Sequence, residues 1–177
     1  MSSGSVHAAS TAQPTLRVVC IDELEGFERL RSTWDSVYAS DPRSHIFVSW
    51  AWLNAWFQVT PFEWLVLAAQ PRESEDFVAF LPLATTTIGW GRAALRRELH
   101  LGGKPLADYT GLLSIREYES QAVDAFARYI LDDIEWDVFC LADVLDDRLS
   151  ELKKHLSGEK LHLTNGVANA CPYMALP

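Results

Sequence analysis

Three strand-like segments follow one another in the middle of the chain with no helical pattern between them. Residues 63–69 (EWLVLAA) and 77–88 (FVAFLPLATTTI) are apolar and are joined by the polar turn QPRESED, which predicts a β-hairpin. Residues 96–101 form a third such segment. A doubly wound fold requires strands and helices in alternation, so the run favours a mixed, largely antiparallel sheet. Pro82 cannot donate to a strand ladder and predicts an edge strand or a bulge.

Helical patterns precede this run. A short strand at 15–21 leads into a helix for which Asp22 and Glu25 have the spacing of a capping box. That helix is expected to end near Pro42, because proline disfavours helical geometry in the residue before it. Residues 49–58 (SWAWLNAWFQ) predict a second, short helix that is apolar nearly all round, and we interpret it as buried.

Strands and helices alternate in the C-terminal part. A strand piece at 109–113 is followed by Ser114 and Glu117, which have the spacing of a second capping box. The apolar run 136–142 is typical of a central strand covered on both faces. The closing elements are a helix over 146–158 and weaker strands at 160–164 and 170–176. We therefore expect one α/β domain over 15–177, after a disordered tail at 1–14.

Composition excludes several classes of protein. The chain has 177 residues, which is room for one domain. Its 15 basic and 24 acidic residues give a net charge of −9, which disfavours nucleic-acid binding. No apolar run reaches the ~18 residues of a membrane-spanning helix, and the polar N-terminus is not a signal peptide. An odd number of cysteines without CxxC spacing indicates reduced, buried thiols in a cytoplasmic protein (Cys20, Cys140 and Cys171).

Asp108 and Tyr109 are the best candidates for catalytic residues. They follow a glycine loop and open a strand, so Asp108 can accept a proton from a substrate amine and Tyr109 can stack on a sugar or peptide. The alternative is a turn-forming aspartate ahead of a packed tyrosine. His100, in the preceding strand, is a candidate substrate contact or base, and a packed or surface histidine is the alternative.

Four of the seven tryptophans lie between Trp50 and Trp64. Trp50, Trp52 and Trp56 are candidates for a glycan-binding surface, against the alternatives of core packing or contact with a partner domain or dimer mate. No metal site is expected: the histidines lack HxH or HExxH spacing, and the seven acidic residues within 132–147 flank an apolar strand.

The element order resembles that of the acyl-CoA N-acyltransferases of the GNAT fold. The stretches HIFVSWAWLNAWF, FLPL and LHLGGKPLADYTGLL resemble, more closely, the acetyltransferases associated with cellulose biosynthesis, the CelD/BcsL-like family. The most specific piece is Leu101-Gly102-Gly103 followed by Asp108-Tyr109. Members of that family have two fused GNAT-type halves, and this chain resembles the N-terminal half.

The resemblance implies acyl transfer from acetyl-CoA or another acyl-CoA to an amine or hydroxyl. The acceptor would be a glycan or small molecule in polysaccharide or envelope synthesis, and a second GNAT-like half or a homodimer mate would be the partner. GNAT enzymes hold the coenzyme pyrophosphate on backbone amides at a glycine-containing turn before a helix. The matching turn here is 113–119, with Ser114 and Arg116 as candidate cofactor contacts.

That turn departs from the family pattern. It contains no glycine, its predicted capping box would occupy the free amides, and Glu117 and Glu119 add negative charge. These features speak against cofactor binding by this chain, so we expect the chain on its own to lack full activity. The alternative function is a non-catalytic acceptor-binding or scaffolding domain that pairs with a catalytic half.

Overall fold

The computed structural model describes residues 16–89, 96–144, 147–156, 162 and 164. Its strands are β1 (Leu16–Ile21), β2 (Glu63–Pro71), β3 (Ala79–Ile88), β4 (Arg96–Leu101), β5 (Leu113–Ser114) and β6 (Val138–Cys140). Its helices are α1 (Leu24–Arg29), α2 (Arg31–Ser40), α3 (Trp50–Val59), α4 (Glu119–Asp132) and α5 (Arg148–Leu156), with 3₁₀ turns η1 (Ile46–Val48) and η2 (Arg116–Tyr118). The predicted tail, the strand at 170–176 and most of that at 160–164 lie outside the described residues.

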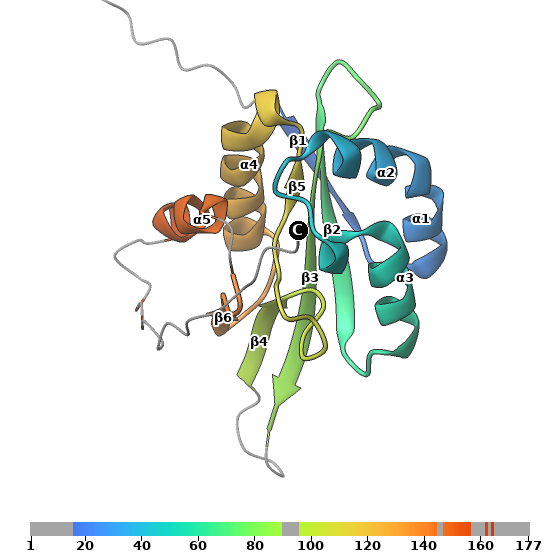
Figure 1. Cartoon of the computed structure of the whole chain (residues 1–177). Helices are drawn as coiled ribbons and strands as arrows, with labels where there is room; N and C mark the ends of the chain where they lie inside the picture. The colour runs from blue at the N-terminus through green and yellow to red at the C-terminus, as the bar shows by residue number, and fades with distance from the viewer. Residues whose placement is uncertain (1–15, 90–95, 145–146, 157–161, 163, 165–177) are drawn as a thin grey trace, which may run out of the picture.

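A six-stranded sheet organises these elements. The strand order is β1-β2-β3-β4-β6, and β5 pairs with β3 beyond the end of β4. All pairs are antiparallel except β4 with β6, which is parallel. Helices α1 to α3 cover one face, and α4 and α5 cover the other (Figure 1). The predicted α/β class, with a mixed, largely antiparallel sheet flanked by helices, is confirmed.

Side-chain alternation along β3 divides the core into two layers. Leu81 and Leu83 pack toward α4 and α5, whereas Phe80 and Ala84 pack toward α1–α3. Trp34 of α2 anchors the second layer: its ring lies 4.4 Å from that of Phe80. Such alternation is the normal consequence of the two-residue period of a strand. Residues 79–84 of β3 are therefore buried on both faces of the sheet.

The predicted first helix is two helices, and its capping box is wrong. The N-cap of α1 is Glu23, which makes no side-chain capping bond. Glu25 instead forms an ion pair of 2.7 Å with Arg29, one turn later. At Leu30 the amide donates to the carbonyl of Phe27, a tighter bond that separates α1 from α2. The expected end before Pro42 is confirmed, since α2 stops at Ser40.

The second capping box is also wrong. Ser114 belongs to β5 and is 1% exposed, and its hydroxyl donates to the carbonyl of Ile115. The helix α4 begins five residues later, with Tyr118 as an N-cap that makes no side-chain bond. The sequence spacing is therefore coincidental: pairing of Ser114 with Ala79 of β3 keeps it out of the helix.

Two predictions about sheet position are wrong. β3 lies between β2 and β4, so Pro82 is not on an edge strand. Pro82 sits where β3 changes partner, between the Leu83–Leu101 and Phe80–Leu113 pairs, so its missing N–H interrupts no continuous ladder there. β6 is half-buried and ends the described strand order, so it is not a central strand covered on both faces.

The cysteines are less buried than expected. Cys20 is exposed and Cys140 half-buried, both as free thiols, because β1 and β6 end the described strand order. Cys171 lies outside the described residues. Among the described residues, no helix has the length and apolarity needed to cross a membrane.

Candidate functional site

The glycine loop after β4 packs too closely for any side chain at its two glycines. A Cβ on Gly102 would lie 2.8 Å from the Cβ of Pro82. Gly103 has a φ of 106°, and a Cβ there would lie 2.9 Å from that of Ala107 and 3.1 Å from the ring of Trp52. Both positions therefore need glycine. The most specific motif of the sequence thus fixes this loop against β3 and α3.

A pocket of about 240 Å³ opens beneath this loop. Its lining comes from the loop, from β3, from β4 and from the segment before β2 (Phe62, Ala84, Thr86, His100, Lys104 and Pro105). The ammonium group of Lys104 pairs with the carboxylate of Asp143. This pocket brings His100, a predicted site residue, to the side of the sheet that carries α1–α3, because His100 pairs with Ala84 of that face.

The carboxylate of Glu98 lies near the imidazole of His100. Its Oε2 lies 3.6 Å from Nε2 of His100, and its other oxygen binds the guanidinium of Arg96. The Glu98 side chain is 13% exposed and that of His100 is 25% exposed. Cys140 pairs with His100 across the parallel β4–β6 ladder. Burial, and then the charge of Glu98, raise the pKa of the Cys140 thiol, so this group stays protonated near neutral pH.

Tyr109 belongs to an aromatic group on the same side of the fold. Its ring centroid lies 6.2 Å from that of His45 and 6.2 Å from that of Phe47. Phe47 in turn meets Trp52 edge-on at 5.4 Å. The structure thus brings together two predicted residues, Tyr109 and Trp52, through two that sequence reasoning missed. Both His45 and Phe47 lie in the HIFVSW stretch that the sequence analysis quotes, which is the signal that could have identified them.

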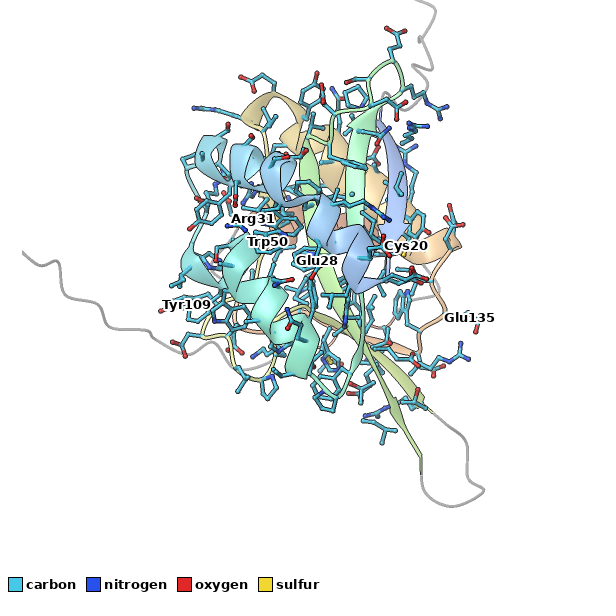
Figure 2. The ribbon with its side chains drawn as sticks, turned by 90° about the vertical axis from the view of Figure 1, so that its right-hand side faces the viewer. Cys20, Glu28, Arg31, Trp50, Tyr109 and Glu135 are labelled. Carbon is cyan, nitrogen blue, oxygen red and sulfur yellow. The ribbon has the colours of Figure 1, made fainter. Side chains whose placement is uncertain are left out.

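The other predicted aromatic residues are engaged in packing. Trp50 stacks on Phe27 at 5.9 Å, and the guanidinium carbon of Arg31 lies 4.7 Å from the centre of the same ring. Figure 2 shows Arg31 and Trp50 together, with Tyr109 on another part of the surface. Trp56 is 3% exposed. Asp108 is exposed, one residue before the half-buried Tyr109. Trp50 and Trp56 therefore fit the packing alternative better than a glycan surface.

An ion-pair network surrounds the turn between β5 and α4. Nη1 of Arg148 lies 2.8 Å from Asp41 and 3.9 Å from Glu119. Nη1 of Arg43 lies 3.0 Å from Glu119 and 3.3 Å from Asp147. Three carboxylates therefore face two guanidinium groups at the N-terminal end of α4. We call these five residues the α4 network.

The residues of this turn do not fit a coenzyme pyrophosphate. A bound anion needs free backbone amides and an excess of positive charge. The amide of Ser114 donates instead to Asp41 at 3.0 Å, and the α4 network carries one more negative than positive charge. Arg116 is exposed on η2, and residues 112–157 contain no glycine. The α4 network and the bond from Ser114 to Asp41 thus replace the capping box that the sequence predicts at this turn.

The chain beyond β6 is hydrogen-bonded to the segment that follows the glycine loop. The Thr110 hydroxyl donates to the carbonyl of Ala142 at 2.8 Å, and the Thr110 amide donates to that of Asp143 at 2.9 Å. Thr110 also forms an isolated parallel bridge with Val144. These bonds continue the contact between β4 and β6 to the residues that follow each strand.

A larger hollow of about 750 Å³ lies on the opposite face of the sheet, beside the same part of β3, and is lined by Cys20, Tyr129 and several carboxylates. Burial, followed by the charge of Asp22, raises the pKa of the Cys20 thiol. Burial and the neighbouring Cys20 raise the pKa of Tyr129. Neither group is activated as a nucleophile. The described residues contain no group of three or more His, Cys, Asp or Glu side chains arranged to hold a metal ion.

Comparison with known proteins gives no family membership. No protein-family model and no curated protein matches the chain. Two solved structures are similar at low identity. One is the aminoglycoside acetyltransferase meta-AAC0020 from an uncultured soil metagenomic sample, in complex with sisomicin, with a TM-score of 0.45 and 11% identity over 89% of this chain and 97% of that chain. The other is the aminoglycoside 6'-N-acetyltransferase AAC(6')-Ih from Acinetobacter baumannii, with a TM-score of 0.45 and 13% identity over 88% and 99%. At this level of similarity, neither structure assigns an activity to the chain.

Proposed function

We propose that this chain is a GNAT-like domain of the acyltransferase class that serves the acceptor side of acyl transfer. The observation that supports the proposal is the sheet, in which four antiparallel strands are followed by a parallel β4–β6 pair connected through α4. This is the element order of the acyl-CoA N-acyltransferases that the sequence resembles. The resemblance to the CelD/BcsL-like family adds an amine or hydroxyl acceptor in polysaccharide or envelope synthesis, and a cytoplasmic location.

In this proposal the chain does not bind acetyl-CoA itself. The α4 network and the bond from Ser114 to Asp41 occupy the turn that would hold the pyrophosphate. The acyl donor therefore has to come from a second GNAT-like half or from a partner chain. A homodimer mate would carry the same closed turn, so we favour a different, catalytic half. The same network supports the second candidate, a non-catalytic acceptor-binding or scaffolding domain.

A thermal melt with and without acetyl-CoA tests this division of roles. A ligand at about 100 times its Kd adds ~2.7 kcal/mol, which raises the Tm of a domain of this size by about 5–10 °C. We expect no rise with millimolar acetyl-CoA. A rise of that size would overturn the assignment of the chain to the acceptor side alone. A melt with inorganic pyrophosphate is the control that separates coenzyme recognition from general anion binding.

The need for a separate catalytic half is tested by mixing such a half with this chain. This chain and a GNAT-like half with an intact glycine-containing turn are purified separately and mixed. We expect release of free coenzyme A, detected with a thiol reagent, only from the mixture with an acceptor present. Equal release by the catalytic half alone would leave the scaffolding role as the better description of this chain.

A further inference from the structure

The glycine motif, His100 and the hairpin jointly build a pocket that the proposed division of roles does not yet explain. Gly102 and Gly103 allow the loop to approach Pro82 and Trp52 more closely than any other residue would permit. That approach places Lys104 and Pro105 opposite His100 at the end of β4. The most specific piece of the sequence is therefore the part that forms a wall of this pocket.

The size of the pocket limits its occupant to a single ring. Its volume of about 240 Å³ falls below the range of about 300–1,000 Å³ that holds drug-sized ligands. Phe62, Ala84 and Pro105 offer apolar contact, which suits the C–H face of a sugar. The hydroxyl of Thr86 and the imidazole of His100 offer hydrogen bonds at the same pocket.

The charges around the pocket are balanced, which favours a neutral occupant. Lys104 is paired with Asp143, and Glu98 is paired with Arg96. A phosphate would meet the carboxylate of Glu98 behind His100, and a cation would meet the ammonium group of Lys104. A hydroxyl-bearing ring carries neither penalty.

His100 is the polar group best placed to meet such a ring. Its side chain is 25% exposed and lines the pocket, so the imidazole is partly accessible. The carboxylate of Glu98, two residues earlier on β4, lies 3.6 Å from Nε2 of this imidazole. The other ionisable groups near His100 are Lys104 on the loop and Cys140 on β6, and Cys140 stays protonated near neutral pH.

We propose that this pocket binds one neutral, monosaccharide-sized ring of the acceptor, with a ring hydroxyl directed at the imidazole of His100. The proposal rests on the acceptor-side function, because it names the substrate class of that role. It puts a proton acceptor against the group that would be acylated. Tyr109, Phe47 and Trp52 lie on the same side of the fold and would contact further units of a longer glycan.

The test follows the imidazole C–H resonances of the full chain by NMR during titration with methyl β-D-glucopyranoside. We expect the His100 resonances to shift saturably, with a Kd of about 1 mM or weaker, as is usual for one ring with few contacts. His155 is exposed on α5, across the sheet, and is the internal reference that should not move. Spermidine and inorganic pyrophosphate, as a cation and an anion, should leave His100 unchanged.

Variants separate a binding role from a structural one. His100→Gln should weaken sugar binding at least tenfold without lowering the Tm by more than the control His155→Gln does. Thr86→Val should weaken binding as well, since it removes a hydroxyl from the same pocket at almost equal volume. Binding to the variants is followed by the backbone amide resonances of the pocket residues, because His100→Gln removes the imidazole signal. If His100→Gln binds the sugar as tightly as the parent chain, or if spermidine or pyrophosphate shifts the His100 resonances of the parent chain as much as the sugar does, the proposal is wrong.

The outcome is independent of the test of the proposed function. The acetyl-CoA melt concerns the turn between β5 and α4, whereas the sugar titration concerns the end of β4. If the chain binds both the sugar and acetyl-CoA, the sugar-pocket proposal stands and the proposed division of roles is wrong. If the chain binds neither but supports acyl transfer together with a catalytic half, the acceptor-side role stands and the sugar-pocket proposal is wrong.

Discussion

Arg148 of α5 and Asp41 at the end of α2 form a buried ion pair across 107 positions of the chain. Nη1 of Arg148 lies 2.8 Å from Oδ2 of Asp41, and the two side chains are 3% and 1% exposed. Arg148 also donates to the carbonyl of Leu112 at 3.1 Å, and Asp41 accepts from the amide of Ser114. The pair thus joins α2 and α5, which cover opposite faces of the sheet, and both residues also bind the segment at β5.

Arg148→Met should destabilise the fold strongly. Removing one partner leaves the carboxylate of Asp41 buried without its guanidinium, and a broken buried pair costs about 3–5 kcal/mol. The exposed pair of Arg29 and Glu25 provides the control, since Arg29→Met should cost less than about 1 kcal/mol. Urea unfolding of both variants measures the difference, and equal losses would show that burial of the Arg148 pair has no energetic consequence.

Gly103→Ala should also destabilise the chain. A non-glycine residue at a φ of 106° costs about 1–3 kcal/mol, and the new methyl group would collide with Ala107 and Trp52. Gly26→Ala is the matched control, because Gly26 lies in α1 and alanine gains up to about 1 kcal/mol of helix propensity there. Its Cβ would lie 3.1 Å from Ile21, which offsets part of that gain. A smaller loss for Gly103→Ala than for Gly26→Ala would contradict the strain argument.

The two described thiols should react slowly at pH 8. Burial and the charge of Glu98 raise the pKa of Cys140. Burial and the charge of Asp22 raise the pKa of Cys20. The reactive thiolate form of each is therefore scarce. Glu98→Gln should accelerate alkylation of Cys140 alone, and Asp22→Asn that of Cys20 alone. Peptide mass spectrometry after iodoacetamide treatment, in a Cys171→Ser background, measures both rates.

The same shifts give the sign of a pH effect on stability. A thiol with a raised pKa in the folded state binds its proton more tightly there than in the unfolded chain. Its contribution to stability is therefore fully present below the unfolded pKa of ~8.5 and is lost as the pH rises through the folded pKa. Unfolding free energies should fall above about pH 8.5, and less steeply for Cys140→Ala than for the parent chain.

Local sequence patterns were sufficient for most of the fold. The hairpin of β2 and β3, the helix α3 and the helix α5 all follow from periodicity and turn residues. These features depend on neighbours in the sequence, which is why they could be predicted. The position of β3 in the sheet depends on which distant strands pair with it, and Pro82 gave the wrong answer for that reason.

The site was predicted in part. His100 and the glycine loop were singled out, but the pocket they share with Phe62 and Thr86 depends on pairing between β3 and β4. The capping box of Ser114 failed because Asp41, 73 positions away, binds its amide. No spacing rule connects such residues, so the α4 network was visible only in three dimensions.

The final prediction tests whether charge closes the turn before α4. Glu119→Gln with Asp147→Asn removes two carboxylates that bind Arg43, and should create a site for inorganic pyrophosphate at the N-terminal end of α4. At about ten times its Kd, pyrophosphate would add ~1.4 kcal/mol and raise the Tm by about 3–6 °C. Asp108→Asn with Glu73→Gln makes the same change in net charge with two exposed residues away from this turn, and should give no rise. A rise in both double variants would assign the effect to net charge alone, whereas no rise in either would mean that the backbone, without a glycine between 112 and 157, excludes the anion by itself.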